Sequence, residues 1–233
     1  MFTIKISGIP IAINNKYSLT ETFCSKFRTN QKSVIAINVT SEEILHEEGE
    51  SSVHAELLCI HRKIALALLD YNAFLLHAAV VDLDGHGLAF SAPSGIGKTT
   101  RVMQWKDSFG DRLKVINGDK PILRFVDEKL FAYGTPWMGK EGLGCNSSVP
   151  LEYVCFLERS EDVALTKLNY EQVIPLLFRQ VLFPKHKDQV ERFMSLMDRF
   201  LSQVSFFLLK CNLEKENPGK IWNEMVVYSA PEI

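Results

Sequence analysis

Apolar residues recur with two different periods along this chain of 233 residues, and each period predicts a different element. Between residues 53 and 71 they return at helical spacing, which predicts a helix. Over 74–83 they are almost continuous, which predicts a strand, and a second strand is expected at 88–90. Further strands are expected at 2–6, 33–39, 113–116, 121–126, 130–133, 153–157, 163–168 and 205–210, and further helices at 170–182, 187–204 and 220–227.

Strands and helices that mix without strict alternation predict an α/β fold with a mixed sheet. Near residue 73 the apolar pattern changes from the helical spacing of 53–71 to the almost continuous run of 74–83. We therefore expect a small α+β region over 1–73, followed by a larger domain over 74–233.

Composition and charge exclude several classes of protein. The chain has 26 Lys and Arg against 28 Asp and Glu, a net charge of −2, and 46% of its residues are hydrophobic. These values exclude a disordered, collagen-like or coiled-coil chain. The balance of charge also argues against nucleic acid as a partner, because binding to a phosphate backbone needs a basic face.

Export and membrane insertion are not expected. The first residues lack the basic and apolar regions of a signal peptide, and the longest apolar stretch is Ile64 to Leu69. That stretch is far shorter than the ~20 residues of a membrane span. The five cysteines form no CxxC pair, so we expect buried, reduced thiols and a cytoplasmic location.

One segment matches a motif with a known chemical role. The run from Ala92 to Thr99 fits a phosphate-binding loop, with Ala92 in place of the first glycine. Its two glycines permit backbone angles at which successive N–H groups face phosphate oxygens. Lys98 would contact the β- and γ-phosphates, and the Thr99 hydroxyl would ligate Mg²⁺. The segment follows a predicted strand and opens a predicted helix that Gly110 ends. The expected nucleotide-binding residues are Ser94, Gly95, Ile96, Gly97, Lys98, Thr99 and Thr100.

A nucleotide site also needs an acidic residue. Asp119 follows the predicted strand 113–116, about twenty residues after the loop, where an acidic residue of such a site is usually found. A turn aspartate beside Gly118 is the alternative. A carboxylate is repelled by a triphosphate unless Mg²⁺ lies between them, so we expect Mg²⁺ at this point.

Several of these residues together resemble the catalytic domain of the HPr kinase/phosphorylase family, with phosphoenolpyruvate carboxykinases as more distant relatives. The resemblance covers Phe74 to Arg159. It implies a P-loop-containing mixed sheet of the HPr kinase and carboxykinase C-terminal type. The resembling residues are Leu76-His77-Ala78-Ala79-Val80-Val81-Asp82, Gly85 and Gly87, the loop itself, Gly118-Asp119-Lys120 and Glu141-Gly142-Leu143-Gly144.

The resemblance implies phosphoryl transfer from ATP to a serine hydroxyl, with Mg²⁺. The catalytic histidine of the family maps onto His77, although a core histidine on an apolar strand is the alternative. The family has two adjacent aspartates where this chain has Asp119 alone, so the roles of metal ligand and acceptor base both stay open for it. Glu141 is the nearest candidate for the metal-binding glutamate of the family. The motif and the resemblance together give Asp119, Lys98 and His77 as the expected catalytic residues, and Thr99, Asp119 and Glu141 as the expected metal ligands.

The region before residue 73 is shorter than the regulatory domain of the full-length enzymes. In this the chain is similar to compact HPr-kinase-like proteins of ribosomal peptide modification, including lasso-peptide kinases. The leading hypothesis is therefore an ATP-dependent kinase acting on a serine of a peptide or protein, and a ribosomal precursor peptide is one such acceptor. The alternative is a nucleotide-binding scaffold without phosphotransfer. The acceptor, the base preference and the oligomeric state stay open.

Overall fold

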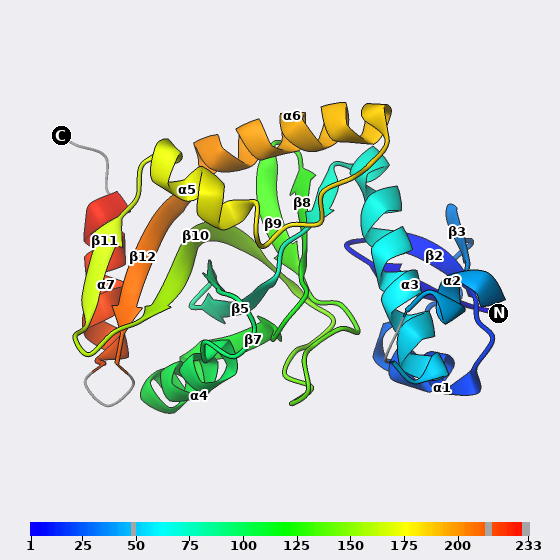
Figure 1. Cartoon of the computed structure of the whole chain (residues 1–233). Helices are drawn as coiled ribbons and strands as arrows, with labels where there is room; N and C mark the ends of the chain where they lie inside the picture. Colours follow the sequence, from blue (N-terminus) through cyan, green and yellow to red (C-terminus); the bar gives the residue numbers. More distant parts are fainter. Residues whose placement is uncertain (48–49, 213–215, 230–233) are drawn as a thin grey trace.

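The computed structural model describes residues 1–47, 50–212 and 216–229, whose path is traced in Figure 1. The described residues form a three-stranded sheet near the N-terminus and a nine-stranded mixed sheet in the rest of the chain. The expected class, α/β with a mixed sheet, is observed.

The N-terminal sheet has the order β1-β2-β3. Its strands are β1 (Phe2–Ile6), β2 (Ile9–Asn14) and β3 (Ile35–Asn38); the helices of this region are α1 (Ser18–Phe23), α2 (Ser41–Leu45) and α3 (Ser52–Ala67), with 3-10 turns η1 (Ser25–Phe27) and η2 (Leu68–Tyr71). β1 and β2 are antiparallel, whereas β2 and β3 are parallel. The sequence did not predict β2, because Pro10 lies within it and a proline weakens a strand signal. The Pro10 carbonyl still accepts a hydrogen bond from the Val34 N–H at 3.0 Å.

The large sheet has the order β4-β8-β9-β10-β6-β5-β7, with β12 beside β10 and β11 beside β12. Its strands are β4 (Ala73–Leu75), β5 (Ala78–Leu83), β6 (His86–Ser91), β7 (Leu113–Asn117), β8 (Ile122–Val126), β9 (Lys129–Tyr133), β10 (Ser148–Arg159), β11 (Ala164–Lys167) and β12 (Ser205–Cys211). β10 is parallel to β6 and β12, and the other pairings are antiparallel. The long strand β10 joins the two parts of the sheet, because it pairs with β9 at its start and with β12 at its end.

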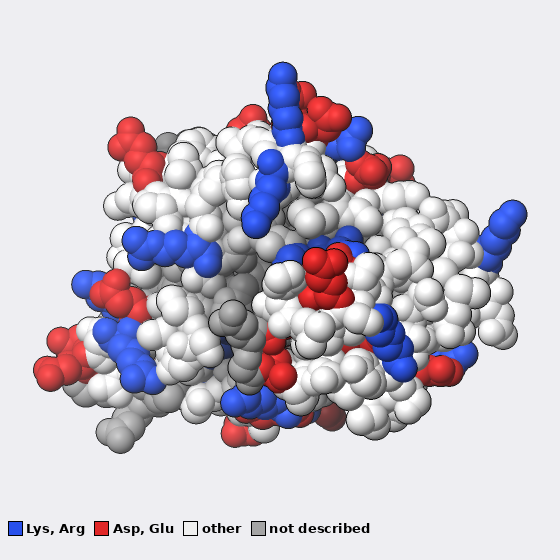
Figure 2. Space-filling model, turned by 45° about the vertical axis from the view of Figure 1, so that its right-hand side comes forward, with Lys and Arg blue, Asp and Glu red and all other residues white. Residues whose placement is uncertain are grey.

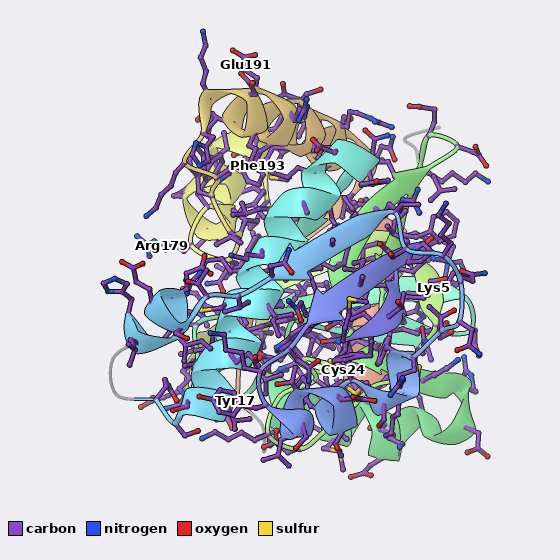
Figure 3. All side chains as sticks on the ribbon, turned by 90° about the vertical axis from the view of Figure 1, so that its right-hand side faces the viewer. Lys5, Tyr17, Cys24, Arg179, Glu191 and Phe193 are labelled. Atoms are coloured by element: carbon purple, nitrogen blue, oxygen red, sulfur yellow. The ribbon has the colours of Figure 1, made fainter. Side chains whose placement is uncertain are left out.

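Helices cover both faces of the large sheet (Figure 1). They are α4 (Lys98–Phe109), followed by the turn η3 (Gly110–Arg112), and α5 (Tyr170–Leu177), α6 (Lys187–Gln203) and α7 (Pro218–Ser229). Phe193 of α6 shares an apolar cluster with Val80, whereas Trp105 of α4 and Met225 of α7 share another with Val81. Neighbouring residues of β5 therefore point to opposite faces that are both buried, which explains the continuous apolar run in the sequence. In Figure 3, α6 presents Phe193 inward and Glu191 outward.

The apolar run 74–83 is not one strand, contrary to expectation: β4 and β5 are separate, with Leu76 and His77 between them. β4 pairs with β8, whereas β5 pairs with β6 and β7, so the chain crosses from one part of the sheet to the other at this point. The N–H of His77 donates to the Gln180 carbonyl at 2.7 Å, and the N–H of Ala78 donates to the Asp119 carbonyl at 3.0 Å. These two bonds take the place of the strand-to-strand hydrogen bonds of a sheet and fix the backbone at His77.

Helix α3 connects the two sheets, and Figure 3 shows it behind the three-stranded sheet. Ile60 and Ile64 of α3 belong to one apolar cluster with Ile122, Trp137 and Met138 from the larger sheet region. The small region therefore shares its core with the large one. The boundary near residue 73 separates the two sheets, but as a domain boundary it stays a prediction.

The surface carries charges of both signs. Figure 2 shows Lys and Arg interspersed with Asp and Glu on one face. Within the described residues, no helix has the length and apolar character that crossing a membrane requires. All five cysteines are free; four are buried as expected, but Cys145 is only half-buried.

Candidate functional site

A loop that bends at two glycines joins β6 to α4. Gly95 and Gly97 have φ angles of 84° and 110°, in the region that a side chain disfavours. Gly97 is the N-cap residue of α4, and its carbonyl accepts the first helical hydrogen bond from the N–H of Arg101 at 3.0 Å. The expected strand–loop–helix arrangement is observed, and Gly110 (φ 59°) ends the helix as expected. Free N–H groups and the positive end of the helix dipole meet at this loop.

Lys98 is the first residue of α4 and only 8% exposed. Its Nζ donates to the Ala92 carbonyl at 2.8 Å and lies 3.1 Å from Nε2 of His77. Burial lowers the pKa of the Lys98 ammonium, and the charge of Asp119 opposes that shift. Lys98 is thus held across the base of the loop, close to both other expected catalytic residues.

Asp119 lies in the turn that the sequence offered as the alternative, and this turn is held by Asn117, which the sequence analysis did not single out. Oδ1 of the buried Asn117 accepts hydrogen bonds from the N–H of Asp119 at 2.9 Å and of Lys120 at 2.8 Å. Nδ2 of Asn117 in turn donates to the carbonyl and hydroxyl oxygens of Thr135. An asparagine that bonds to the backbone two residues on is a known turn signal, so the Asn-Gly-Asp order was the available clue.

His77 lies between Lys98 and Asp119. Its Nε2 is 3.1 Å from Asp119 Oδ1 and 3.1 Å from Lys98 Nζ, and its Nδ1 is 3.0 Å from Oε1 of Gln180. With Nδ1–H donating to Gln180, a neutral ring has a lone pair on Nε2 that accepts from Lys98; a protonated ring donates to Asp119 instead. A proton on Nε2 therefore changes the partner of His77. Gln180 was missed because it is distant in the sequence.

The same contacts set the charge of Asp119. Burial raises the pKa of this carboxyl, but the hydrogen bond from His77 and the charges of Lys120, His77 and Lys98 outweigh burial and hold the pKa below its ordinary value. Asp119 is thus a carboxylate at neutral pH, suited to binding a cation or accepting a hydrogen bond from a hydroxyl.

These residues line one cavity of about 450 Å³. Lys140 also lines it, and a Cβ placed on Gly139 would lie 3.5 Å from Asp119 Cβ and 3.8 Å from Glu141 Oε2. All but one of the sequence-predicted site residues lie here; Ile96 packs against the apolar cluster around Trp105 and lines a neighbouring cavity. The residues lining the cavity are His77, Ser94, Gly95, Gly97, Lys98, Thr99, Thr100, Gly118, Asp119, Gly139, Lys140 and Glu141.

The donor set fits Mg²⁺ in its chemistry. Thr99, Asp119 and Glu141 offer the oxygen donors that Mg²⁺ prefers, and all three line the cavity. Across the described parts of the chain, no cluster of three or more His, Cys, Asp or Glu residues forms an all-protein metal cage. Mg²⁺ commonly uses one or two carboxylates together with phosphate oxygens, so this pair of acidic residues is sufficient.

We expect Gly118→Ala to destabilise the fold by about 1–3 kcal/mol, the usual cost of overpacking. A Cβ at this position would lie 2.6 Å from the Met138 carbonyl oxygen and 3.0 Å from that of Leu143. Urea unfolding measures the loss. Gly219→Ala is the matched control, because its Cβ would have only an ordinary contact at 3.5 Å. Equal stability of the two variants would contradict the close packing at Gly118.

Behind the site, α3 packs His61 against Trp137, with ring centroids 4.8 Å apart. Trp137 is itself buried. Burial, together with the nearby charge of Lys120 and against the opposing charge of Asp119, lowers the pKa of His61 from 6.5 to about 3. The folded protein therefore holds His61 neutral where the unfolded chain would protonate it.

This difference predicts a pH dependence of stability. The unfolded chain binds a proton at His61 below pH 6.5, and the folded protein does so only near pH 3. Stability is therefore fully present above pH 6.5 and falls as the pH is lowered, by ~1.4 kcal/mol per pH unit from this group. Urea unfolding between pH 6 and pH 4 should show a shallower loss for His61→Gln than for the wild type. Parallel curves for the two proteins would refute the buried, neutral state of His61.

Comparison with protein families finds no family model that matches, and comparison with curated proteins finds no relative. Among solved structures, the chain is similar to the HPr(Ser) kinase/phosphatase from Coxiella burnetii, with a TM-score of 0.42 and 10% sequence identity. The likeness covers 66% of this chain and 91% of that one. An identity and a score this low do not establish membership of a family.

Proposed function

We propose that this protein is an ATP-dependent kinase that transfers a phosphoryl group to a serine hydroxyl of a peptide or protein. One observation carries the proposal. Nε2 of His77 lies 3.1 Å from both Lys98 Nζ and Asp119 Oδ1, and the three side chains line one cavity at the N-terminus of α4. Residues 74–233 would form the catalytic unit, with 1–73 as a smaller addition. The free cysteines are consistent with a reducing, cytoplasmic location.

The loop side of the cavity would bind the donor. N–H groups between Gly95 and Thr100 would face phosphate oxygens, and Lys98 would place a positive charge beside them. Among the described residues Lys98 forms no ion pair, and its hydrogen-bond partners are the Ala92 carbonyl and His77, so its charge stays available to phosphate. Thr99, Asp119 and Glu141 would hold Mg²⁺, which when bound neutralises charge on the phosphates.

The opposite side would bind the acceptor. The serine oxygen forms a bond to the γ-phosphorus, the bond from that phosphorus to the bridging oxygen of ADP breaks, and the hydroxyl proton leaves toward Asp119. His77, 3.1 Å from that carboxylate, is placed to share the proton. Positioning of the reactants and electrostatic stabilisation would supply most of the rate enhancement, because the protein itself takes little part in the covalent chemistry of phosphoryl transfer.

A second candidate is a nucleotide-binding scaffold without transfer. The lowered pKa of Asp119 favours it, because a carboxylate of low pKa is a weak proton acceptor. This candidate predicts nucleotide binding with no product.

Mass spectrometry separates the two candidates. The protein is incubated with Mg²⁺, ATP labelled at the γ-phosphate and a set of serine-containing peptides, including those encoded beside its gene. A gain of one labelled phosphate on serine supports the kinase. Binding of ATP with no labelled product on any peptide or on the protein itself supports the scaffold.

A further inference from the structure

Strand β7 lies at one end of the large sheet, and among the described residues it pairs with strand β5 alone. The Asp84 N–H donates to the Arg112 carbonyl at 3.3 Å, so the backbone of Arg112 faces β5. Because backbone groups in an antiparallel pair alternate between the partner strand and the opposite side, those of Leu113 and Val115 face away from β5. The outer side of β7 is therefore an edge on which another strand can pair.

Part of this edge is already occupied. The Leu113 N–H donates to the Gly110 carbonyl in the turn before the strand, and the Ile116 carbonyl accepts from the Cys145 N–H at 3.1 Å. The Val115 carbonyl accepts from Sγ of Cys145 at 3.3 Å. Two outward groups are left, the carbonyl of Leu113 and the N–H of Val115, and neither has a hydrogen-bond partner in the part of the chain that the structure describes.

The two free groups lie at a cavity of about 510 Å³, which is lined by Leu113, Lys114 and Val115 and, on its other side, by Gly142 and Leu143. The free carbonyl and the free N–H flank Lys114. At this spacing one residue of a parallel strand donates to the first group and accepts from the second. An extended peptide backbone supplies both the donor and the acceptor, and proteins commonly bind peptides by adding them as a strand to an open sheet edge.

This cavity adjoins the site of Asp119 across one loop. Residues 139–141 line the cavity that contains Asp119, and the next residues, 142–145, line the cavity beside β7. Val115 precedes Asp119 by four positions in the sequence, and an extended chain rises about 3.3 Å per residue. A peptide on this edge would therefore bring a serine that lies about four residues beyond its paired segment to Asp119.

A second copy of this chain is the other strand that could pair here. The exposed Lys114 lies between the two free groups, so antiparallel pairing of two copies would place their Lys114 side chains opposite each other. Like charges at directly opposed positions destabilise a strand pair, and a lysine on an edge strand is a common protection against such pairing. The edge therefore favours a peptide over self-association.

We propose that an extended segment of the acceptor peptide adds to the outer edge of β7, with one residue bonded to the Leu113 carbonyl and the Val115 N–H and with its serine at Asp119. This inference rests on the proposed function, which supplies the phosphoryl group and the role of Asp119. It adds that the protein recognises the acceptor through main-chain hydrogen bonds. The acceptor is therefore extended on one side of its serine and does not present that serine from a helix.

N-methylation of the acceptor backbone tests the pairing on the wild-type protein. Each serine peptide that gains phosphate from labelled ATP is resynthesised with a methyl group on one amide at a time, about three to five residues from the serine and on either side. The methyl group removes the peptide's N–H donor, and its bulk hinders the second bond, while every side chain is kept. On one side of the serine kcat/KM should fall roughly 5- to 150-fold, the usual contribution of two hydrogen bonds, through a higher KM with kcat kept within about twofold.

Val115→Pro removes the free N–H from the protein. A proline is tolerated on an edge strand where its missing N–H would face away from the sheet. This variant should raise KM for the unmodified peptide, and methylation should then have little further effect, because both changes break the same pairing. Leu165→Pro on the edge strand β11 is the matched control and should keep the wild-type KM. The bond from the Leu168 N–H to the Phe206 carbonyl sets an alternation in which the Leu165 N–H also faces outward.

The peptide measurement does not depend on whether Val115→Pro folds. Equal kcat/KM for the unmodified peptide and for all of its methylated forms would overturn the assignment, and the proposed function would then still stand. A wild-type loss that a folded Val115→Pro protein does not reproduce would overturn it too, as would labelled phosphate on the protein itself but on no peptide. Absence of labelled phosphate from every peptide and from the protein removes the proposed function itself.

Discussion

Asp119→Asn is expected to lower the rate of phosphoryl transfer by about 10²–10⁴-fold, the usual contribution of a positioned proton acceptor. The asparagine keeps the size of the side chain but removes the negative charge that His77 and Lys98 face in the folded protein. The backbone turn is held by Asn117 and does not depend on that charge. Fold and metal-free ATP affinity should therefore persist while transfer is lost.

The measurement is transfer of labelled phosphate at saturating ATP, together with ATP affinity in the absence of Mg²⁺. Asp107→Asn, on the exposed surface of α4, is the control and should leave both unchanged. Full transfer activity in Asp119→Asn would refute any catalytic role for this carboxylate. A loss that appears only as weaker binding of Mg·ATP would assign Asp119 to the metal rather than to the acceptor.

Lys98→Ala is expected to weaken ATP binding by roughly 10- to 150-fold, equivalent to ~1.5–3 kcal/mol for one charge-assisted contact. Lys98 is the first residue of α4, and its Nζ points back along the loop and donates to the Ala92 carbonyl. Its removal takes away the charge beside the phosphates and also the neighbour of His77. Transfer should fall further than binding, since the lysine also faces charge that develops during the reaction.

Thermal unfolding must accompany this measurement, because Lys98 is largely buried and makes two contacts. Lys106→Ala, in the last turn of the same helix and exposed, is the matched control and should keep the wild-type ATP affinity. An unchanged ATP affinity in a folded Lys98→Ala protein would show that phosphate does not bind at this loop.

Much of the framework is local and was therefore predictable from the sequence. The strand, loop and helix around Gly95 and Gly97, the end of α4 at Gly110 and the hairpin between β8 and β9 all follow from backbone preferences within a few residues. Strand β2 was missed because Pro10 obscured it, and α5 ends at Leu177, five residues earlier than the helix expected over 170–182. Only the pairing partners of a segment, which lie far along the chain, decide such cases.

The sequence by itself determined that a loop with two glycines opens α4 and that an acidic residue follows the next strand, because both depend on short-range spacing. The tertiary structure alone decided that His77 stands between Lys98 and Asp119, because a break between β4 and β5 places it there and Gln180, 103 positions away, orients its ring. It alone also brought Arg159 from the end of β10 against Gly95. Such contacts join residues that lie far apart in the sequence, so no local pattern predicts them. Only the packing of the sheet brings these residues together.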